Sequence, residues 1–232
     1  MILSNKRQEE MKQYIYDIKV NPRKVSWLYR FFKRIGDIFI SLIFILLSSP
    51  LLIIIFIILL FAKNGAPIYA DKRIGKGGKE IKVLKFRSMY KDADDNPRKY
   101  LNDEQYEQFI NERKVVNDPR VTKFGRIIRK ASIDELPQLF NILVGTMSVV
   151  GNRPITRLEL ETNYSEEQQK IFVSARPGLT GWWQVSGRNN VEYYNGERQK
   201  IELEYYEKRS LWFDTKILFK TIPAVLKHKG VQ

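Results

Sequence analysis

The chain has 232 residues, enough for one folded domain together with a membrane element. Lys and Arg number 40 against 26 Asp and Glu, and this formal net charge of +14 predicts an anionic partner: a phosphate-bearing substrate, a nucleic acid or an anionic lipid surface. The lack of Cys excludes disulfides, thiolate nucleophiles and Cys-based zinc sites, and the single His, His228, argues against a His-dependent triad. Nucleophilic, acid–base or metal chemistry must therefore depend mainly on carboxylates, Lys, Tyr and hydroxyls.

Residues 1–32 are mixed and polar, and we interpret them as an N-terminal arm at a membrane surface. They lead into an uncharged apolar stretch from Ile38 to Ala62. As a helix rising ~1.5 Å per residue, this stretch would reach about 37 Å, which exceeds the ~30 Å hydrocarbon core of a bilayer. It is too long and too far from Met1 for a signal peptide, so a single transmembrane helix is the simplest interpretation on length alone.

Two features argue against a straight span. Ser48, Ser49 and Pro50 lie at its midpoint, and a proline removes a backbone donor and clashes with the preceding turn, which predicts a break there. Both flanks are also basic, since residues 1–34 carry nine Lys/Arg against three Asp/Glu and residues 63–91 carry nine against two. Because basic flanks prefer the cytoplasm, a helix-break-helix hairpin in one leaflet satisfies both ends. The residues alone leave the spanning and re-entrant topologies evenly balanced.

One acidic residue, Asp37, lies at the N-terminal end of the apolar stretch, beside Lys33 and Arg34. It is either an ordinary interfacial charge or part of a buried ion pair that anchors the membrane hairpin to the following domain.

The remaining residues, 63–232, are expected to fold as one domain, since we find neither internal repeats nor a low-complexity linker in them. Turn residues predict a β-hairpin with strands at 67–70 and 81–87, and the charged residues 92–114 are expected to form a solvated helical excursion. Apolar periodicity predicts a basic amphipathic segment at 121–130, helices at 136–144, 159–174, 197–212 and 214–229, and a Gly- and Trp-rich loop at 176–190. The expected fold class is therefore α/β and mostly helical.

Two adjacent carboxylates, Asp134 and Glu135, follow a basic run and precede the apolar helix that begins near Leu136. Ser132 and Glu135 match a capping box, and acids near a helix N-terminus stabilise it by ~0.3–1 kcal/mol, so the local pattern favours a cap. One cap needs only one acid, which leaves Asp134 unexplained. The surrounding cations would keep Asp134 ionised, as a nucleophile requires, and would also bind the phosphates of an activated substrate.

Four blocks of residues follow one another in a specific order. They are Lys33-Arg34-Ile35-Gly36-Asp37 before the stretch broken at Ser49-Pro50; Pro67-Ile68-Tyr69, Arg73-Ile74-Gly75 and Lys85-Phe86-Arg87-Ser88-Met89; Ser132 to Leu139 with Asn141, Met147 to Gly151 and Arg153-Pro154; and Arg176 to Gly181, Gln184 to Asn189, Ser210-Leu211-Trp212 and Asp214. Together the blocks cover roughly the last 200 residues, and in this order the chain resembles the bacterial sugar transferase family, the monotopic polyprenyl-phosphate phosphoglycosyltransferases.

The resemblance implies a re-entrant hairpin over residues 33–62 and a catalytic domain over 63–232, on the cytoplasmic face of the bacterial inner membrane. It implies transfer of a sugar-1-phosphate from a UDP-sugar to undecaprenyl phosphate, with release of UMP and a covalent phosphosugar–aspartyl intermediate. Trp182-Trp183 resembles the branch that handles hexose phosphates. Such a reaction is the first membrane step in the assembly of exopolysaccharide, capsule, O-antigen or glycoprotein glycans. The expected partners are the two substrates and membrane lipid, not nucleic acid, while a homo-oligomer and downstream glycosyltransferases remain open.

By the same resemblance Asp134 would be the nucleophile, and Glu135, with Asp134, would hold Mg²⁺. The expected phosphate-binding residues are Lys85, Arg87, Arg126 and Arg153, and the expected nucleotide-sugar-binding residues are Arg176, Gly178, Thr180, Gln184 and Arg188. Asp214 is a further candidate whose role the resemblance leaves open. The family usually has proline where this chain has Asn152, so we expect a less rigid loop and a less defined position for Arg153.

Two other functions fit the composition. A charge of +14 suits a membrane-tethered nucleic-acid-binding module, but its cations would then form a groove with stacking aromatics, whereas many here lie beside the membrane segment and the carboxylates. A catalytically silent scaffold for polysaccharide assembly would tolerate the loss of both Asp134 and Glu135. Release of UMP from a UDP-sugar distinguishes a transferase from both alternatives.

Overall fold

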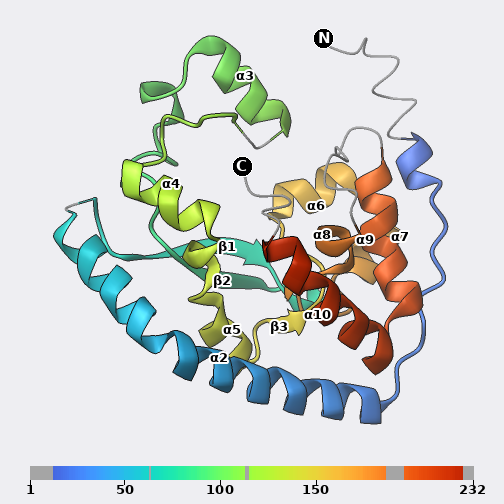
Figure 1. Ribbon diagram of the computed structural model, residues 1–232. Coiled ribbons are helices and arrows are strands. Elements are labelled where there is room, and N and C mark those ends of the chain that lie inside the picture. The colour runs from blue at the N-terminus through green and yellow to red at the C-terminus, as the bar shows by residue number, and fades with distance from the viewer. Residues whose placement is uncertain (1–12, 63, 113–114, 187–195, 227–232) are drawn as a thin grey trace.

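The computed structural model describes residues 13–62, 64–112, 115–186 and 196–226. In this part of the chain a long helix, α2, runs along one edge of a body made of shorter helices and two two-stranded sheets (Figure 1). The elements are α2 (Trp27–Phe61), β1 (Ile68–Ile74), β2 (Glu80–Phe86), α3 (Asp103–Glu112), α4 (Lys123–Lys130), the 3-10 turn η3 (Ile133–Glu135), α5 (Gln138–Val144), β3 (Ser148–Val150), α6 (Arg157–Asn163), α7 (Glu166–Phe172), β4 (Gly178–Thr180), α8 (Trp182–Val185), α9 (Glu197–Lys208) and α10 (Leu211–Leu226). The expected mostly helical fold with a small β-hairpin is confirmed.

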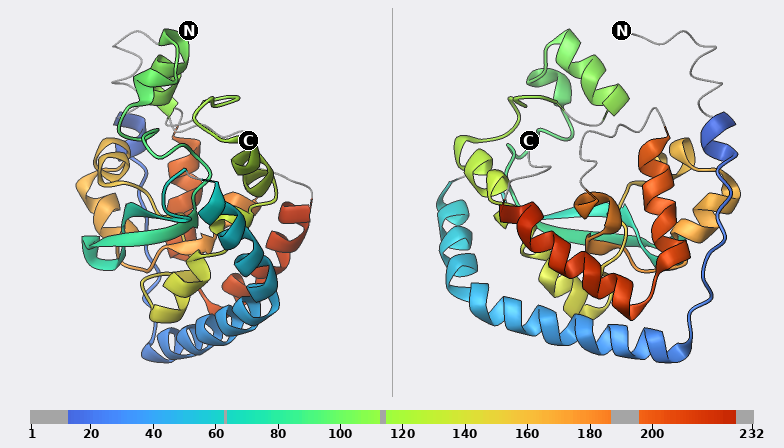
Figure 2. Two further views of the ribbon diagram at one scale, coloured as in Figure 1. Left: turned by 90° about the vertical axis from the view of Figure 1, so that its left-hand side faces the viewer. Right: turned by 45° about the vertical axis from the view of Figure 1, so that its right-hand side comes forward.

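The long helix α2 continues through the proline at its centre. The expected break at Pro50 is a bend inside one helix of 35 residues, not a separation into two arms (Figures 1 and 2). Pro50 has no N–H to offer the carbonyl oxygen of Leu46, and the Ser49 hydroxyl donates to that oxygen at 2.9 Å instead. Ser49 and Pro50 therefore shape the helix together, because the serine satisfies the acceptor that the proline leaves open.

The outward face of α2 is apolar and open. Phe39, Leu46, Leu47 and Phe61 are each more than half exposed, and the helix is long and apolar enough to cross a membrane. An exposed apolar surface of this extent is typical of a face that meets lipid or a partner protein.

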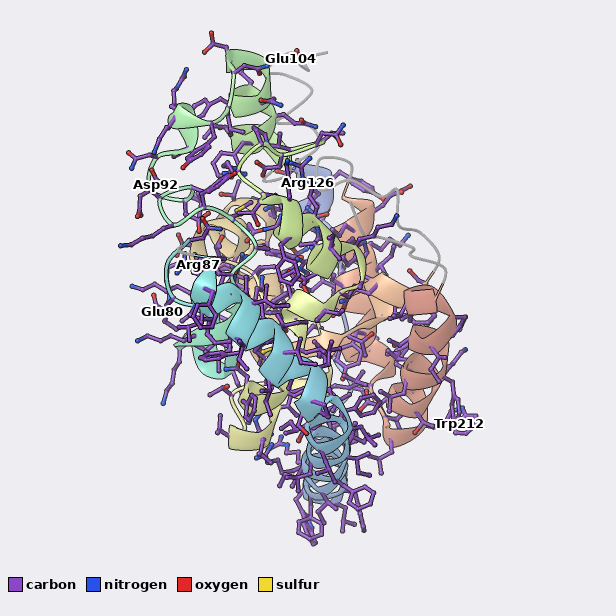
Figure 3. The ribbon with its side chains drawn as sticks, turned by 60° about the vertical axis from the view of Figure 1, so that its left-hand side comes forward. Glu80, Arg87, Asp92, Glu104, Arg126 and Trp212 are labelled. Carbon is purple, nitrogen blue, oxygen red and sulfur yellow. The ribbon has the colours of Figure 1, made fainter. Side chains whose placement is uncertain are left out.

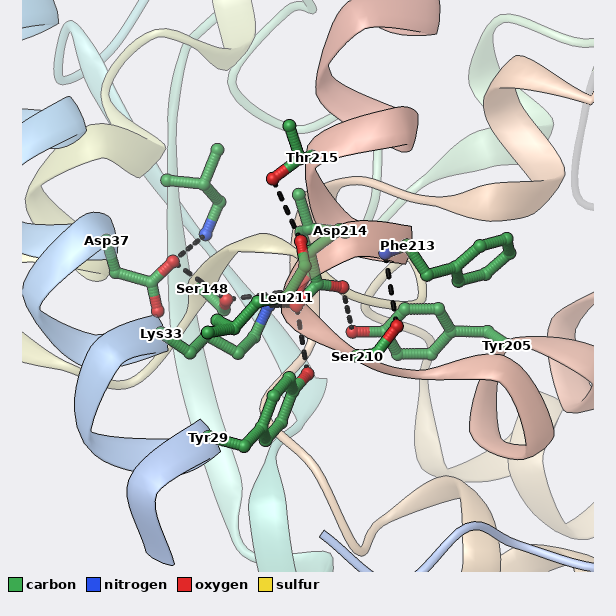
Figure 4. Close-up of polar contacts among 12 residues, drawn as sticks. Tyr29, Lys33, Asp37, Ser148, Tyr205, Ser210, Leu211, Phe213, Asp214 and Thr215 are labelled. Atoms are coloured by element: carbon green, nitrogen blue, oxygen red, sulfur yellow. Dashed lines mark hydrogen bonds and ion pairs between the residues drawn. The ribbon is translucent and has the colours of Figure 1, made fainter. Parts of the chain in front are cut away.

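The N-terminal third of α2 is fixed to the body by a buried ion pair. Lys33 Nζ lies 2.8 Å from Asp214 Oδ2 and 2.9 Å from the Val150 carbonyl oxygen. The hydroxyls of Tyr29 and Tyr205 also donate to the Asp214 carboxylate, at 2.9 and 3.0 Å (Figure 4). Asp214, a site candidate in the sequence, therefore joins α2, β3, α9 and α10 at one point.

Two further contacts hold the same part of α2. Asp37 is buried, and one carboxylate oxygen accepts the Ser148 hydroxyl and the Val149 N–H, both at 2.9 Å (Figure 4). Asp37 thus anchors the helix, as one of the two sequence interpretations expected. It does so through hydrogen bonds, whereas the ion pair is formed by Lys33 with Asp214. Arg34 donates to the carbonyl oxygens of Ile142 and Leu143 at 2.6 and 2.7 Å, which satisfies the C-terminal end of α5.

The C-terminal half of α2 packs on the same body. Leu52, Ile55 and Leu59 are buried in one apolar cluster with Phe86 of β2 and Ile128 of α4. Both ends of the apolar helix therefore rest on one domain.

The two short strands β3 and β4 lie parallel and were not expected from the sequence. Ser148 pairs with Gly178 and Val150 with Thr180, which brings together segments that lie thirty residues apart. The two backbones are so close that a Cβ atom on Gly178 would lie 2.1 Å from the Gly151 nitrogen. Only glycine fits at 178, because any side chain there would push the strands apart.

The helix expected at 159–174 is wrong in one respect, since it is two helices, α6 and α7. Tyr164 is extended between them and Ser165 begins a new helix with its own capping box to Gln168. The local cap signal overrides the apolar periodicity that runs through both helices.

The described part of the N-terminal arm packs along the domain. In Figure 2 it runs from the start of α2 up the side of the body to α7 and α9. Ile15 is buried, and Gln168 of α7 donates to the carbonyl oxygens of Ile15 and Ile18 at 2.7 and 3.1 Å. These residues of the arm are thus part of the domain surface.

The buried ion pair yields a stability prediction. Asp214→Ala leaves the Lys33 ammonium, whose side chain is 17% exposed, without its partner, and removes the acceptor of two tyrosine hydroxyls. We expect a loss of about 3 kcal/mol, or a Tm lower by roughly 5–10 °C, in thermal unfolding of the detergent-solubilised protein.

Two further variants test the origin of that loss. Glu80→Ala breaks the exposed Lys72–Glu80 pair, with side chains 72% and 56% exposed, and is expected to shift Tm little. Replacing both partners, by Lys33→Met with Asp214→Asn, is expected to recover part of the loss because no charge stays buried alone. Equal Tm values for Asp214→Ala and Glu80→Ala would contradict the structural role of the pair.

Candidate functional site

A pocket opens where the β-hairpin, the start of α5, the β3–β4 pair and α8 meet. Its lining residues are Lys85, Glu135, Gln138, Arg153, Pro154, Gly178, Leu179 and Gln184. Five of these were expected site residues: Lys85, Glu135, Arg153, Gly178 and Gln184. The fold thus gathers blocks two, three and four of the sequence around one opening.

The carboxylate pair lies in the 3-10 turn η3, directly before α5. The capping box expected from Ser132 and Glu135 is wrong: Ser132 adopts a left-handed conformation with φ of 55° and forms no capping hydrogen bond. The helix α5 begins later, at Gln138, with Pro137 in the capping position. Neither side chain of this pair forms a hydrogen bond or ion pair with any residue that the structure describes, so both carboxylates are available to a ligand. Glu135 lines the pocket, whereas Asp134 is not among its lining residues.

The surroundings of Asp134 affect its pKa in two opposite directions. Burial and, next, the charge of Glu135 raise the pKa of Asp134 to about 6, while Arg129, Lys85 and Arg153 oppose the rise. The sequence suggested that the surrounding cations keep Asp134 ionised. The cations oppose the rise in its pKa but do not cancel it. At neutral pH the carboxylate is still mostly ionised, and its raised pKa makes it more basic than a solvated aspartate.

The cation Lys85 is held at the pocket by a network on the hairpin. Its ammonium lies 3.2 Å from Asp71 Oδ2, and Arg73 binds the same carboxylate at 2.8 Å. Burial is the main cause that lowers the pKa of Lys85, and Asp71 counteracts it. Lys85 therefore faces the pocket with a charge that Asp71 only partly balances.

The four expected phosphate-binding residues divide into two groups. Lys85 and Arg153 line the pocket. Arg87 instead donates to the Ala66 carbonyl oxygen at 2.8 Å, and Arg126 is exposed on α4 (Figure 3). Neither of these two lines the pocket.

Arg129 is the cation that the sequence interpretation left out. It is the largest opposing influence on the pKa of Asp134, and its Nε donates to the Ser88 hydroxyl at 2.7 Å. The available signal was helical spacing, because Arg129 follows buried Gly125 by four residues and so lies on the same face of α4.

The expected nucleotide-sugar residues also divide. Gly178 and Gln184 line the pocket, whereas the Thr180 hydroxyl shares a 2.8 Å hydrogen bond with Thr221 of α10. Arg176 is half-buried at the start of the β4 segment and does not line the pocket. Arg188 lies outside the described residues.

Asn152, which replaces the usual proline, does not loosen its loop. Its side-chain amide donates to the Glu202 carbonyl oxygen at 2.8 Å, and its own carbonyl accepts the Gly178 N–H at 2.8 Å. Buried side-chain and backbone bonds thus supply the restraint that a proline ring would give, and Arg153 follows directly at the pocket.

The donor set at the pocket suits a magnesium ion bound together with substrate. The described residues contain no group of three or more His, Cys, Asp or Glu that could hold a metal ion by itself. Mg²⁺ is commonly held by one or two carboxylates plus substrate phosphates. The free carboxylates of Asp134 and Glu135, beside two phosphate-compatible cations, fit that pattern.

A comparison with known proteins gives the family. The protein-family model described as "Bacterial sugar transferase" matches residues 28–228 of this chain. The chain belongs to the bacterial sugar transferase family. The match covers all four blocks and leaves residues 1–27 of the N-terminal arm outside it.

The relatives of this family member are named for exopolysaccharide production or for sugar-phosphate transfer involving undecaprenyl phosphate. It is 42% identical over 200 residues to the exopolysaccharide production protein ExoY of Rhizobium meliloti, covering 85% of this chain and 87% of that protein. It is 42% identical over 204 residues to the undecaprenyl-phosphate galactose phosphotransferase of Salmonella typhimurium, covering 87% of this chain and 42% of that protein. It is 37% identical over 203 residues to the UDP-glucose:undecaprenyl-phosphate glucose-1-phosphate transferase of Escherichia coli, covering 85% of this chain and 41% of that protein. The chain thus matches nearly all of ExoY and less than half of the two larger enzymes.

The raised pKa of Asp134 predicts a pH dependence. A nucleophilic Asp134, which the resemblance implies, must be deprotonated, so kcat/KM for the donor should rise between pH 5 and 7 with a midpoint near 6, where an ordinary aspartate would already be fully active. The measurement is donor turnover from pH 5 to 8 at constant ionic strength. A rate that stays flat down to pH 5 would contradict the assigned environment of Asp134.

Proposed function

We propose that this protein transfers a sugar-1-phosphate, most simply a hexose-1-phosphate, from a UDP-sugar to undecaprenyl phosphate and releases UMP. The observation that carries the proposal is the free carboxylate pair Asp134–Glu135, half-buried near Lys85, Arg129 and Arg153 in a member of the sugar transferase family. The names of three relatives support the acceptor, and two of them also name a UDP-sugar donor.

The chemistry follows as two displacements at one phosphorus atom. An Asp134 oxygen attacks the phosphorus that carries the sugar, the bond to the UMP oxygen breaks, and UMP leaves with the electron pair. A phosphate oxygen of undecaprenyl phosphate then attacks the same phosphorus and releases the Asp134 carboxylate, which yields the sugar–diphosphate lipid. Lys85, Arg129 and Arg153 neutralise phosphate charge, which is the main demand of phosphoryl transfer.

Glu135, together with Asp134, would hold Mg²⁺ through carboxylate oxygens. When bound, the ion would neutralise charge on the phosphate oxygens of the substrate. After burial, the charge of Glu135 is the second cause that raises the pKa of Asp134, and a raised pKa makes the Asp134 carboxylate a more basic nucleophile.

The packing of α2 supports a re-entrant placement in the membrane with the domain on the cytoplasmic face. Lys33 and Asp37 near one end, and Leu52 and Leu59 near the other, all attach to the same body. A helix that crossed the bilayer would have to release one of these attachments, because one domain cannot lie on both sides. The basic flanks favour the cytoplasm for both ends.

The first step makes a sharp prediction for Asp134. Asp134→Asn keeps the size of the side chain but removes the nucleophilic oxygen charge, so UMP release from a UDP-sugar with undecaprenyl phosphate and Mg²⁺ should fall by at least about 10³-fold. Asp95→Asn, an exposed carboxylate elsewhere, is the matched control and should retain full activity.

Two outcomes would contradict the proposal. Asp134→Asn with wild-type UMP release would remove the nucleophile assignment. Absence of UMP release by wild-type protein with every UDP-sugar, combined with salt-sensitive oligonucleotide binding, would favour the nucleic-acid-binding alternative.

The topology is tested by cysteine labelling, since the native chain has no Cys. Lys24→Cys and Ala70→Cys lie at exposed positions on the two sides of α2, and both should react with a membrane-impermeant maleimide from the cytoplasmic side only. Leu47→Cys, 73% exposed in the protein, should resist the reagent because lipid covers it. Labelling of the first two positions from opposite sides would establish a simple span.

A further inference from the structure

Gln138 lines the pocket, and its side chain has no hydrogen-bond partner among the residues that the structure describes. Its side chain is 97% buried, since only 3% of the residue is exposed. Neither of its polar atoms is among the fully buried atoms that lack a partner, so the amide keeps an opening, and its place in the pocket lining lets a ligand complete its hydrogen bonds.

The chemistry of the amide differs from that of its neighbours. Lys85 and Arg153 supply positive charge, and Glu135 supplies negative charge. A phosphate oxygen is best served by the two cations, whereas a glutamine both donates and accepts. Two parts of a UDP-sugar have both capacities, namely its hydroxyl groups and the imide edge of its uracil.

A second glutamine strengthens this chemistry. Gln184 of α8 lines the same pocket, and its amide nitrogen is engaged by the Leu179 carbonyl oxygen at 3.2 Å. Its amide oxygen is buried and has no hydrogen-bond partner. Among the described residues, the pocket thus carries the amide of Gln138 and the amide oxygen of Gln184 without hydrogen-bond partners, beside the charged groups that suit phosphate.

We propose that Gln138, assisted by Gln184, binds hydroxyl groups of the donor's sugar and so determines which sugar is accepted. This inference rests on the proposed function. Gln138 follows Asp134 by four residues, and the sugar stays joined to Asp134 through its phosphate after UMP has left. In the proposed reaction the sugar is therefore the part of the donor that remains joined to this segment through both displacements, whereas the nucleotide leaves after the first.

The test compares donors that lack single hydroxyls. Once the preferred UDP-hexose is known, kcat/KM is measured for it, for its 2-, 3-, 4- and 6-deoxy analogues and for the donor with 2′-deoxyribose. For wild-type protein, kcat/KM should be about 10- to 100-fold lower with at least one deoxyhexose donor than with the parent donor. Gln138→Met keeps the length and apolar packing of the side chain. Its kcat/KM with the parent donor should be lower than the wild-type value by a similar factor, and its kcat/KM with that deoxy analogue should be almost the same as with the parent donor.

The matched control is Gln168→Met. Gln168 is also a buried helical glutamine, 2% exposed, but it holds the N-terminal arm away from the pocket. Its replacement should lower Tm and leave the ratio of parent to deoxy donor unchanged.

Each remaining result has a defined meaning. A Gln138→Met protein that keeps the wild-type deoxy ratios, or that changes only the 2′-deoxyribose ratio, would overturn this inference alone. Wild-type protein that releases no UMP from any UDP-sugar would overturn the proposed function and this inference with it.

Discussion

The ion pair between Lys33 and Asp214 is the junction on which the arrangement of membrane helix and domain depends. It is buried, and Tyr29 and Tyr205 donate to the same carboxylate. Lys33 also holds the carbonyl oxygen of Val150, the last residue of β3. Three residues later the chain reaches Arg153 at the pocket, so the residue that fixes the membrane helix also fixes the strand that leads to the site. A site serving a soluble and a lipid substrate needs this coupling, because the pocket must stay at a defined height relative to the bilayer.

At the candidate site, burial and the charge of neighbouring groups act in opposite directions on the ionisation of Asp134. Two carboxylates lie side by side in a partly desolvated turn, and together these effects raise the pKa of Asp134 against three nearby cations. The balance leaves Asp134 ionised but basic at neutral pH, which suits a nucleophile. The same cations suit the phosphates that must approach it. The left-handed Ser132 belongs to this arrangement, since it places Asp134 and Glu135 in a turn of their own instead of in the first turn of α5.

Local signals in the sequence were sufficient where the structure is local. The hairpin with its glycine turn, the start of α10 near Asp214 and the end of α5 at Gly145, with φ of 90°, follow from residues near one another in the chain. The capping box failed because Ser132 and Glu135 have the right spacing but the wrong backbone conformation. The order of the motif blocks, rather than any one of them, identified the family correctly.

What the sequence did not yield depends on distant residues. The pairing of β3 with β4 and the bond from Lys33 to Asp214, 181 residues away, have no local signature. The choice of Arg129 over Arg126 at the carboxylates depends on which side of α4 meets Ser88 of the hairpin segment. Gln138 was read only as part of a motif, because its lack of partners is visible only when the pocket around it is assembled.

The covalent intermediate is the central claim and can be observed directly. The full-length protein in detergent or nanodiscs would be mixed with its UDP-sugar and Mg²⁺ but no lipid acceptor, and analysed by intact-protein and peptide mass spectrometry. The account predicts one equivalent of UMP per enzyme and a mass increase of one sugar phosphate on the peptide that contains Asp134, which undecaprenyl phosphate then removes. An enzyme that turns over with both substrates present, yet shows neither the added mass nor UMP release without the lipid, would contradict it.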